Sequence, residues 1–156
     1  MRPTLRRVHA PVARAVHAPP GQPEYCLTGM QADDRFQAGL AVRKEVLGAE
    51  HVERSLENAS EFTRAMQDLV TEYCWGGVWT RPGLDRRTRS LLNLAMLTAL
   101  GWGHELEVHV RGALTNGATE DEIRETLLQA AVYAGVPAGM EAFRRADAVL
   151  AAAKGS

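Results

Sequence analysis

Apolar side chains recur along most of this chain with the spacing of amphipathic helices. From Asp33 onward the period is close to 3.6 residues, and no run alternates in the manner of a strand. We therefore predict an all-α fold of about six helices joined by short loops. The pattern indicates helices over residues 33–47, 86–100, 104–116, 119–134 and 137–153, a short one at 50–58, and one from Ser60 that loosens at Gly76-Gly77.

Local signals mark several helix ends. Asp85 is a good N-cap, Thr119 with Glu122 forms a capping box, and Pro137 suits the first turn of the last helix. Residues 91–97 are apolar nearly all round, which favours the centre of a bundle or a subunit interface. In the helix from Ser60, apolar side chains recur at helical spacing at Phe62, Met66, Leu69, Val70 and Tyr73.

Composition narrows the classes of function. The chain has 156 residues, 18 basic against 19 acidic, and no apolar run near the length that spans a membrane. We therefore expect a cytoplasmic protein that binds neither nucleic acid nor membrane. Residues 1–30 hold four arginines, five prolines and one acid, which predicts a disordered Arg/Pro-rich extension. Residues 31–156 form the predicted helical domain.

The densest polar cluster lies on the helix over 104–116. Glu105 and His109 are four residues apart, so they share a helix face and the carboxylate can orient the imidazole. His104 and His109 are five apart, which misses the spacing of a zinc-binding His pair, so we predict no metal site. An exposed face with a favourable Glu–His pair is the alternative interpretation.

Arginines and aromatic residues gather near the turns around residue 80. The arginines could form an anion-binding rim, or a solvated face paired with nearby acids. The aromatic residues flank loops and could wall a cleft or fill a core. The two sets are Arg81, Arg86, Arg87 and Arg89, and Tyr73, Trp75, Trp79 and Trp102.

Ordered blocks from Asp34 to Leu150, about three quarters of the chain, resemble the carboxymuconolactone decarboxylase family. The resemblance implies an AhpD-like helical bundle that assembles through helix packing between subunits, as a homotrimer or homohexamer. It also implies cofactor-independent decarboxylation of a small dicarboxylate lactone, 4-carboxymuconolactone, in protocatechuate breakdown. The blocks are Leu69–Gly76, Arg81–Arg86, Arg89–Leu100, His104–Leu114 and Gln129–Gly139.

The resemblance also suggests roles for the polar clusters. His109, oriented by Glu105, would protonate the substrate carbon, and His104 would stabilise charge on the lactone oxygen. The remaining candidates would bind the substrate: Arg81, Arg86 and Arg89 would hold its spectator carboxylate, and Trp79 and Trp102 would enclose it.

Two other classes of function remain open. The wider superfamily includes AhpD-like alkylhydroperoxidases, which need a Cys-x-x-Cys pair four residues before a histidine. With His109 at that histidine, Trp102 and Glu105 occupy the cysteine positions, and Cys74 is a lone thiol. This makes thiol-dependent peroxidase activity the weaker alternative. The other alternative is a non-enzymatic bundle that binds an acidic metabolite.

Overall fold

The computed structural model describes residues 31–155, and the predicted extension over residues 1–30 lies outside that range. Within it the chain forms seven α-helices and one π-helix without a strand, which confirms the predicted all-α class with a helix count close to that expected. No helix in this range is long and apolar enough to cross a membrane. The elements are α1 (Ala32–Leu47), α2 (Ala49–Glu57), α3 (Glu61–Leu69), η1 (Val70–Trp79), α4 (Arg86–Leu100), α5 (Gly103–Thr115), α6 (Glu120–Ala134) and α7 (Val136–Lys154).

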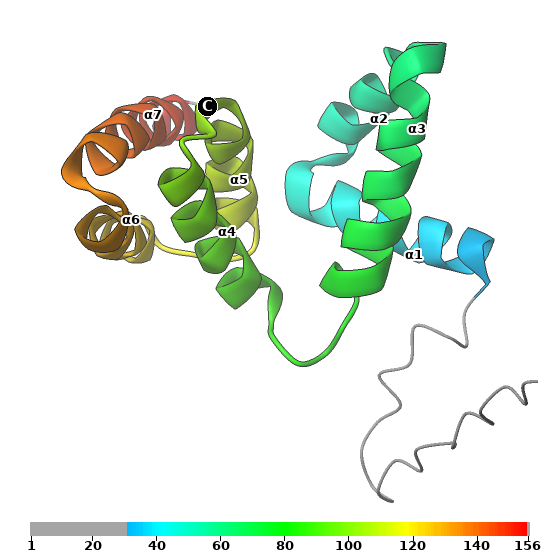
Figure 1. The fold of residues 1–156 in the computed structure, drawn as a ribbon, viewed down its shortest axis with the longest axis horizontal. Coiled ribbons are helices and arrows are strands. Elements are labelled where there is room, and N and C mark those ends of the chain that lie inside the picture. The colour runs from blue at the N-terminus through cyan, green and yellow to red at the C-terminus, as the bar shows by residue number, and fades with distance from the viewer. Residues whose placement is uncertain (1–30, 156) are drawn as a thin grey trace, which may run out of the picture.

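The helices form two groups, which Figure 1 shows side by side. The N-terminal group contains α1, α2, α3 and η1, and the C-terminal group contains α4 to α7. A loop over residues 80–85 joins them in the chain, and α1 packs against α5. Any side chain on the inner faces of α1, η1, α4 or α5 therefore lies near the junction of the two groups.

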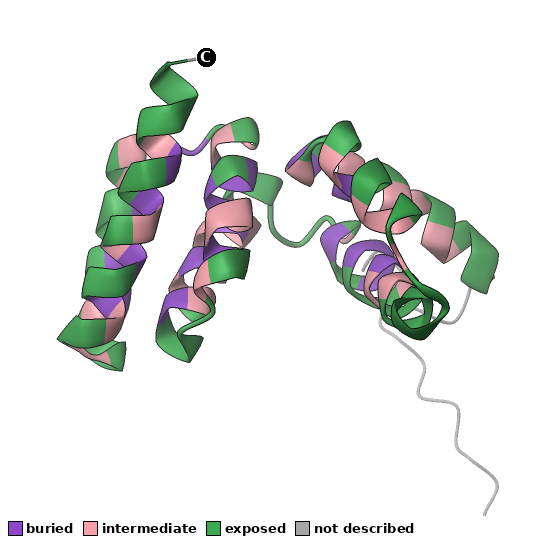
Figure 2. Cartoon of the chain, turned by 90° about the horizontal axis from the view of Figure 1, so that it is seen from above, coloured by how far each residue is buried: buried purple, intermediate pink, exposed green. Residues whose placement is uncertain are grey.

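The C-terminal group is a four-helix bundle with an aliphatic core. Leu94 of α4, Leu106 of α5, and Ile123 and Leu127 of α6 are almost completely buried. The buried positions face inward along each helix (Figure 2), as an amphipathic period requires. The bundle is thus a scaffold that holds α4 and α5 in fixed positions.

The N-terminal group has a smaller core of different composition. Val42 and Val46 of α1 pack with Trp75 and Trp79 of η1, and the two tryptophan ring centroids are 4.7 Å apart. Arg43 is buried in the same group. The core nearest the junction is therefore aromatic and partly polar rather than aliphatic.

Helix α3 continues into a π-helix where it passes α1. The predicted loosening at Gly76-Gly77 begins earlier, at Val70, and both glycines are buried. A Cβ atom on Gly39 of α1 would lie 2.2 Å from the backbone oxygen of Thr71, and one on Gly76 would lie 2.2 Å from the backbone oxygen of Arg35. The α1 and η1 backbones are in direct contact, so only glycine fits at these two positions.

Local signals placed the helix ends well. The Asp85 side chain accepts a hydrogen bond from the Thr88 backbone N–H at 2.7 Å. Thr119 and Glu122 form the reciprocal capping box, and Pro137 lies in the first turn of α7. These predictions are confirmed.

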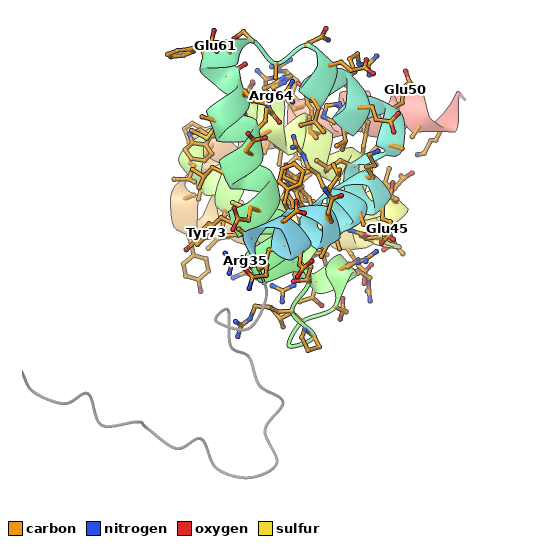
Figure 3. All side chains as sticks on the ribbon, turned by 90° about the vertical axis from the view of Figure 1, so that its right-hand side faces the viewer. Arg35, Glu45, Glu50, Glu61, Arg64 and Tyr73 are labelled. Carbon is orange, nitrogen blue, oxygen red and sulfur yellow. The ribbon has the colours of Figure 1, made fainter. Side chains whose placement is uncertain are left out.

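Among the residues that the structure describes, two apolar surfaces face solvent in the single chain. The stripe predicted in the helix from Ser60 is largely exposed, with Phe62 93% exposed and Tyr73 projecting outward (Figure 3). In the apolar stretch of α4, Leu94 is buried, whereas Leu92 and Met96 are exposed. These surfaces are available for contacts beyond one chain.

Candidate active site

His109 lies at the junction of the two helix groups. It projects from α5 towards η1 and is half-buried, with its ring centroid 6.3 Å from that of Trp75 and 6.5 Å from that of Trp79. Its ring is nearly parallel to Trp75, with an interplanar angle of 8°. The bundle thus presents an imidazole to the aromatic core of the other group.

A second polar side chain reaches His109 from α4. The amide nitrogen of Asn93 lies 3.5 Å from Nδ1 of His109, a long hydrogen-bonding distance. An amide in this position fixes the plane of the imidazole and leaves Nε2 as the atom free to face a ligand. The geometry therefore suits a proton carrier whose orientation is held from α4.

Burial controls the charge of His109. The loss of solvent lowers its pKa from 6.5 to about 4, and the negative charge of Glu105 opposes this shift only in part. The imidazole is therefore neutral at pH 7 in the unliganded protein. Glu105 is exposed, so its influence on His109 is electrostatic, and the contact within the described residues comes from Asn93.

Arg89 stands out among the arginines around the turn. It lies one helical turn before Asn93 on α4, is half-buried, and donates from Nη2 to the backbone oxygen of Arg81 at 3.0 Å. Its buried Nε has no hydrogen-bond partner within residues 31–155. By contrast, Arg86 pairs with Glu45, and Arg87 donates from Nε to Glu122 at 3.0 Å.

Two predicted site residues lie farther out. Trp102 precedes α5 and is 55% exposed. His104 is also exposed, and its charge acts on His51 of α2 rather than on His109. The structure therefore brings His109 together with Trp79 and Asn93, and Arg89 lies one helical turn before Asn93 on α4.

Asn93 and Trp75 belong to this arrangement but were not among the predicted site residues. Asn93 interrupts an otherwise apolar run and follows Arg89 by one helical turn, which is a signal that sequence reasoning could have used. Trp75 was recognised only as part of an aromatic cluster, because its contact with His109 joins segments far apart in the chain.

The described residues contain no group of three or more His, Cys, Asp or Glu side chains that could hold a metal ion. Cys74, the free cysteine in that part of the chain, is exposed on η1.

Comparison with known proteins identifies the family. Residues 64–148 match the carboxymuconolactone decarboxylase family. This chain belongs to that family. A 4-carboxymuconolactone decarboxylase of Acinetobacter baylyi is 47% identical over 120 residues, covering 77% of this chain and 90% of the relative.

A second relative carries a different substrate in its name. The nitrosuccinic acid decarboxylase of Metarhizium robertsii is 55% identical over 107 residues, which cover 69% of this chain and 75% of the relative. An uncharacterised 15.0 kDa protein of Paracoccus denitrificans is 39% identical over 97 residues, covering 56% of this chain and 72% of the relative. Family and named relatives confirm the prediction of a carboxy-lyase.

Proposed function

We propose that this decarboxylase acts on 4-carboxymuconolactone and releases CO2 and the enol-lactone of 3-oxoadipate, as a cytoplasmic enzyme. The similarity to the Acinetobacter enzyme over nine tenths of that protein supports the choice of substrate. The observation that carries the proposal is the neutral His109, which lies beside Trp75 and Trp79 and contacts Asn93, one helical turn from an arginine whose buried Nε is unpaired within the described residues.

The substrate itself accepts the electron pair of the C–C bond that breaks. The carboxylate that leaves is attached to the γ-carbon of an unsaturated lactone. When its C–C bond breaks, CO2 departs and the electron pair moves through the alkene to the lactone carbonyl, which gives a dienolate. One proton at the α-carbon then completes the enol-lactone. This protein has to bind, desolvate and protonate.

His109 is the proposed proton donor. A neutral imidazole is too weak an acid to donate its ring proton, so His109 must first take up a proton from solvent and become an imidazolium. The two negative charges of the bound substrate raise the pKa of His109, because an opposite charge nearby favours the imidazolium. Binding would therefore load the proton, and decarboxylation would consume it. Glu105 adds to this effect from the helix surface.

The other site residues receive binding roles. Arg89 would hold the spectator acetate carboxylate through its free Nε, with Arg81 and Arg86 at the rim. Trp75 and Trp79 would keep water from the leaving carboxylate, since an apolar wall favours the loss of charge as CO2. The more exposed candidates would act at the mouth of the site: His104 as a donor to the lactone oxygen and Trp102 as a cover.

Nitrosuccinic acid is a second candidate substrate, favoured by the 55% identity to the Metarhizium enzyme. Both compounds contain a succinate unit whose carbon bearing the leaving carboxylate also carries an electron acceptor. The acceptor is an unsaturated lactone in one and a nitro group in the other. Loss of CO2 from nitrosuccinate moves the electrons onto the nitro group, and protonation of the same carbon follows. The same site could serve both reactions.

A direct comparison of the two substrates tests the proposal. We expect CO2 release from freshly generated 4-carboxymuconolactone with a kcat/KM at least tenfold above that for nitrosuccinate. The reverse ratio would assign the second function. If the folded protein releases CO2 from neither compound, both proposed functions are refuted.

Arg89→Ala tests the binding role. We expect KM to rise about tenfold, the effect of a lost charge-assisted hydrogen bond, with a smaller change in kcat. Arg87→Ala is the matched control, because Arg87 lies two residues earlier on the same helix but pairs with Glu122 on the outside. An unchanged KM in Arg89→Ala would place the carboxylate elsewhere.

We also propose that the chain forms a homotrimer or homohexamer through its exposed apolar surfaces. Phe62, Met66, Leu69 and Tyr73 form one such surface on α3 and η1, and Leu92 and Met96 contribute to another on α4. Sedimentation at micromolar concentration should show three or six subunits. Phe62→Asp should shift the distribution towards monomer, and a monomeric wild type would refute the assembly.

A further inference from the structure

Arg43 of α1 is a buried cation that has no ion-pair partner within residues 31–155. The side chain is only 7% exposed, yet its partners are neutral: Nη1 donates to the hydroxyl of Thr71 at 2.9 Å, and Nη2 donates to the amide oxygen of Gln67 at 2.8 Å. Its Nε is buried and lacks a hydrogen-bond partner in the described chain. Buried charges in proteins are normally paired, so this arrangement is an exception that needs a cause.

The surroundings of Arg43 add positive charge. Burial lowers the pKa of His51 of α2, and the charges of Arg111, Arg43 and His104 lower it further. Arg54 acts in the same direction, but it forms an ion pair with Glu50, with 3.5 Å between the charged atoms.

Three carboxylates on α1, α2 and α5 are held by other cations. Glu53 pairs with Lys44, Glu45 with Arg86, and Glu107 with Arg145. Burial lowers the pKa of Arg43, because desolvation disfavours the charged guanidinium. The cluster therefore has the electrostatics of an anion site.

The N–H donors of Arg43 that have no acceptor among the described residues indicate which kind of anion the site would bind. A guanidinium has five N–H donors, and Thr71 and Gln67 accept one each from Nη1 and Nη2. Nε and the remaining donors form the edge that binds the two oxygens of a carboxylate side by side. A neutral His51 can donate a further hydrogen bond to the same group.

We propose that Arg43 of α1 and His51 of α2 bind a carboxylate group between these two helices. Two sources share this chemistry. One is the second carboxylate of the substrate, a reading that rests on the proposed function. The other is a separate carboxylate, such as the product or another small acid, bound beside the substrate.

Calorimetric titration of the full chain with succinate tests the site, with the uncharged succinamide as the control ligand. We expect Arg43→Gln to weaken succinate binding about tenfold or more, and Arg43→Lys to restore part of it, because a lysine keeps the charge without the fork. Arg64→Gln, at an exposed arginine of α3, should bind succinate as the wild type does.

Equal affinity of Arg43→Gln and wild type would overturn the proposal, as would a wild type that does not bind succinate. A purely structural Arg43 would change the unfolding temperature without changing affinity, which the two measurements separate. If Arg43→Gln does not fold, His51→Gln and Arg43→Lys take its place: weaker binding by both supports the site, and unchanged binding by both refutes it.

Inhibition kinetics distinguish the two sources. Succinate that competes with substrate, together with a raised KM in Arg43→Gln, assigns the site to the substrate's own carboxylate. Succinate that inhibits or activates without competing, with an unchanged KM, assigns it to a separate acid. The titration does not depend on turnover, so a protein that releases no CO2 but binds succinate through Arg43 would refute the proposed function alone.

Discussion

The two helix groups are built on different principles. The bundle of α4 to α7 has an aliphatic core around Leu94 and Leu127, whereas the N-terminal group buries two tryptophans and Arg43 and contains a π-helix. π-Helical turns occur frequently at functional sites although they are less stable than α-helical ones. The comparison teaches that the residues that stabilise the fold and the residues of the candidate site lie largely in different groups. His109 is the site residue that the bundle provides.

Removal of the imidazole should give the largest effect. We expect His109→Ala to lower kcat by about 10²–10⁴, the usual contribution of a general acid or base. Steady-state CO2 release measures the effect, and circular dichroism verifies folding. Because His109 is not part of the aliphatic core, the unfolding temperature should change little by comparison. Wild-type turnover by a folded variant would remove His109 from the mechanism.

A cavity in the bundle should lower the stability of the protein and leave kcat unchanged. Leu127→Ala should lower the free energy of unfolding by about 2–5 kcal/mol, because it removes fully buried methyl groups. The folded fraction should keep its kcat. Leu128→Ala is the matched control, since this neighbour is 46% exposed, and urea unfolding compares the two. Equal losses in both variants would contradict the assigned core.

An added methyl group at the contact between α1 and η1 tests whether activity depends on the close packing of these two helices. Gly39→Ala puts a methyl group against backbone atoms of Thr71 and Gly76, which cannot move aside as a side chain could. We expect a loss of about 1–3 kcal/mol in stability and a fall in kcat as Trp75 is displaced. Gly83→Ala, with nothing within 4 Å, should change neither quantity.

The pH dependence of stability should also report on His109 at the junction. His109 has a pKa of about 4 when folded and 6.5 in the unfolded chain. Between these values the unfolded chain takes up the proton and the folded one does not. Stability therefore falls as pH falls from about 6.5 to about 4, by at most about 1.4 kcal/mol per pH unit for this group.

The same group can be removed to isolate its effect. In His109→Gln this part of the slope should disappear, while the contributions of His51 and the carboxylates remain in both proteins and cancel in the difference. Urea unfolding at several pH values gives the comparison. Parallel curves for the two proteins would mean that His109 is as solvated when folded as when unfolded.

Sequence reasoning succeeded where the cause is local. The caps at Asp85 and Thr119 depend on neighbouring residues, and these helix starts were predicted within a residue. The π-helix from Val70 was not predicted, because it accompanies the contact of Gly76 with the backbone of Arg35 on another helix. The exposure of the Phe62 stripe was not predicted either, because helical periodicity reveals an apolar face but not what covers it.

The candidate site was predicted only in part, for a related reason. His109 and Glu105 were found because their spacing lies within one helix. The ring contacts of His109 with Trp75 and Trp79, and its contact with Asn93, join three segments, so no spacing in the chain reveals them. The unpaired Nε atoms of Arg43 and Arg89 depend on where every nearby acid finds its partner.

The glycine contact between α1 and η1 also limits how the molecule can move. Two backbones that touch without intervening side chains have no compressible layer to slide on, so these helices should travel as one body and carry both indoles with them. A rearrangement that admits a ligand to His109 should therefore leave the contact between α1 and η1 unchanged.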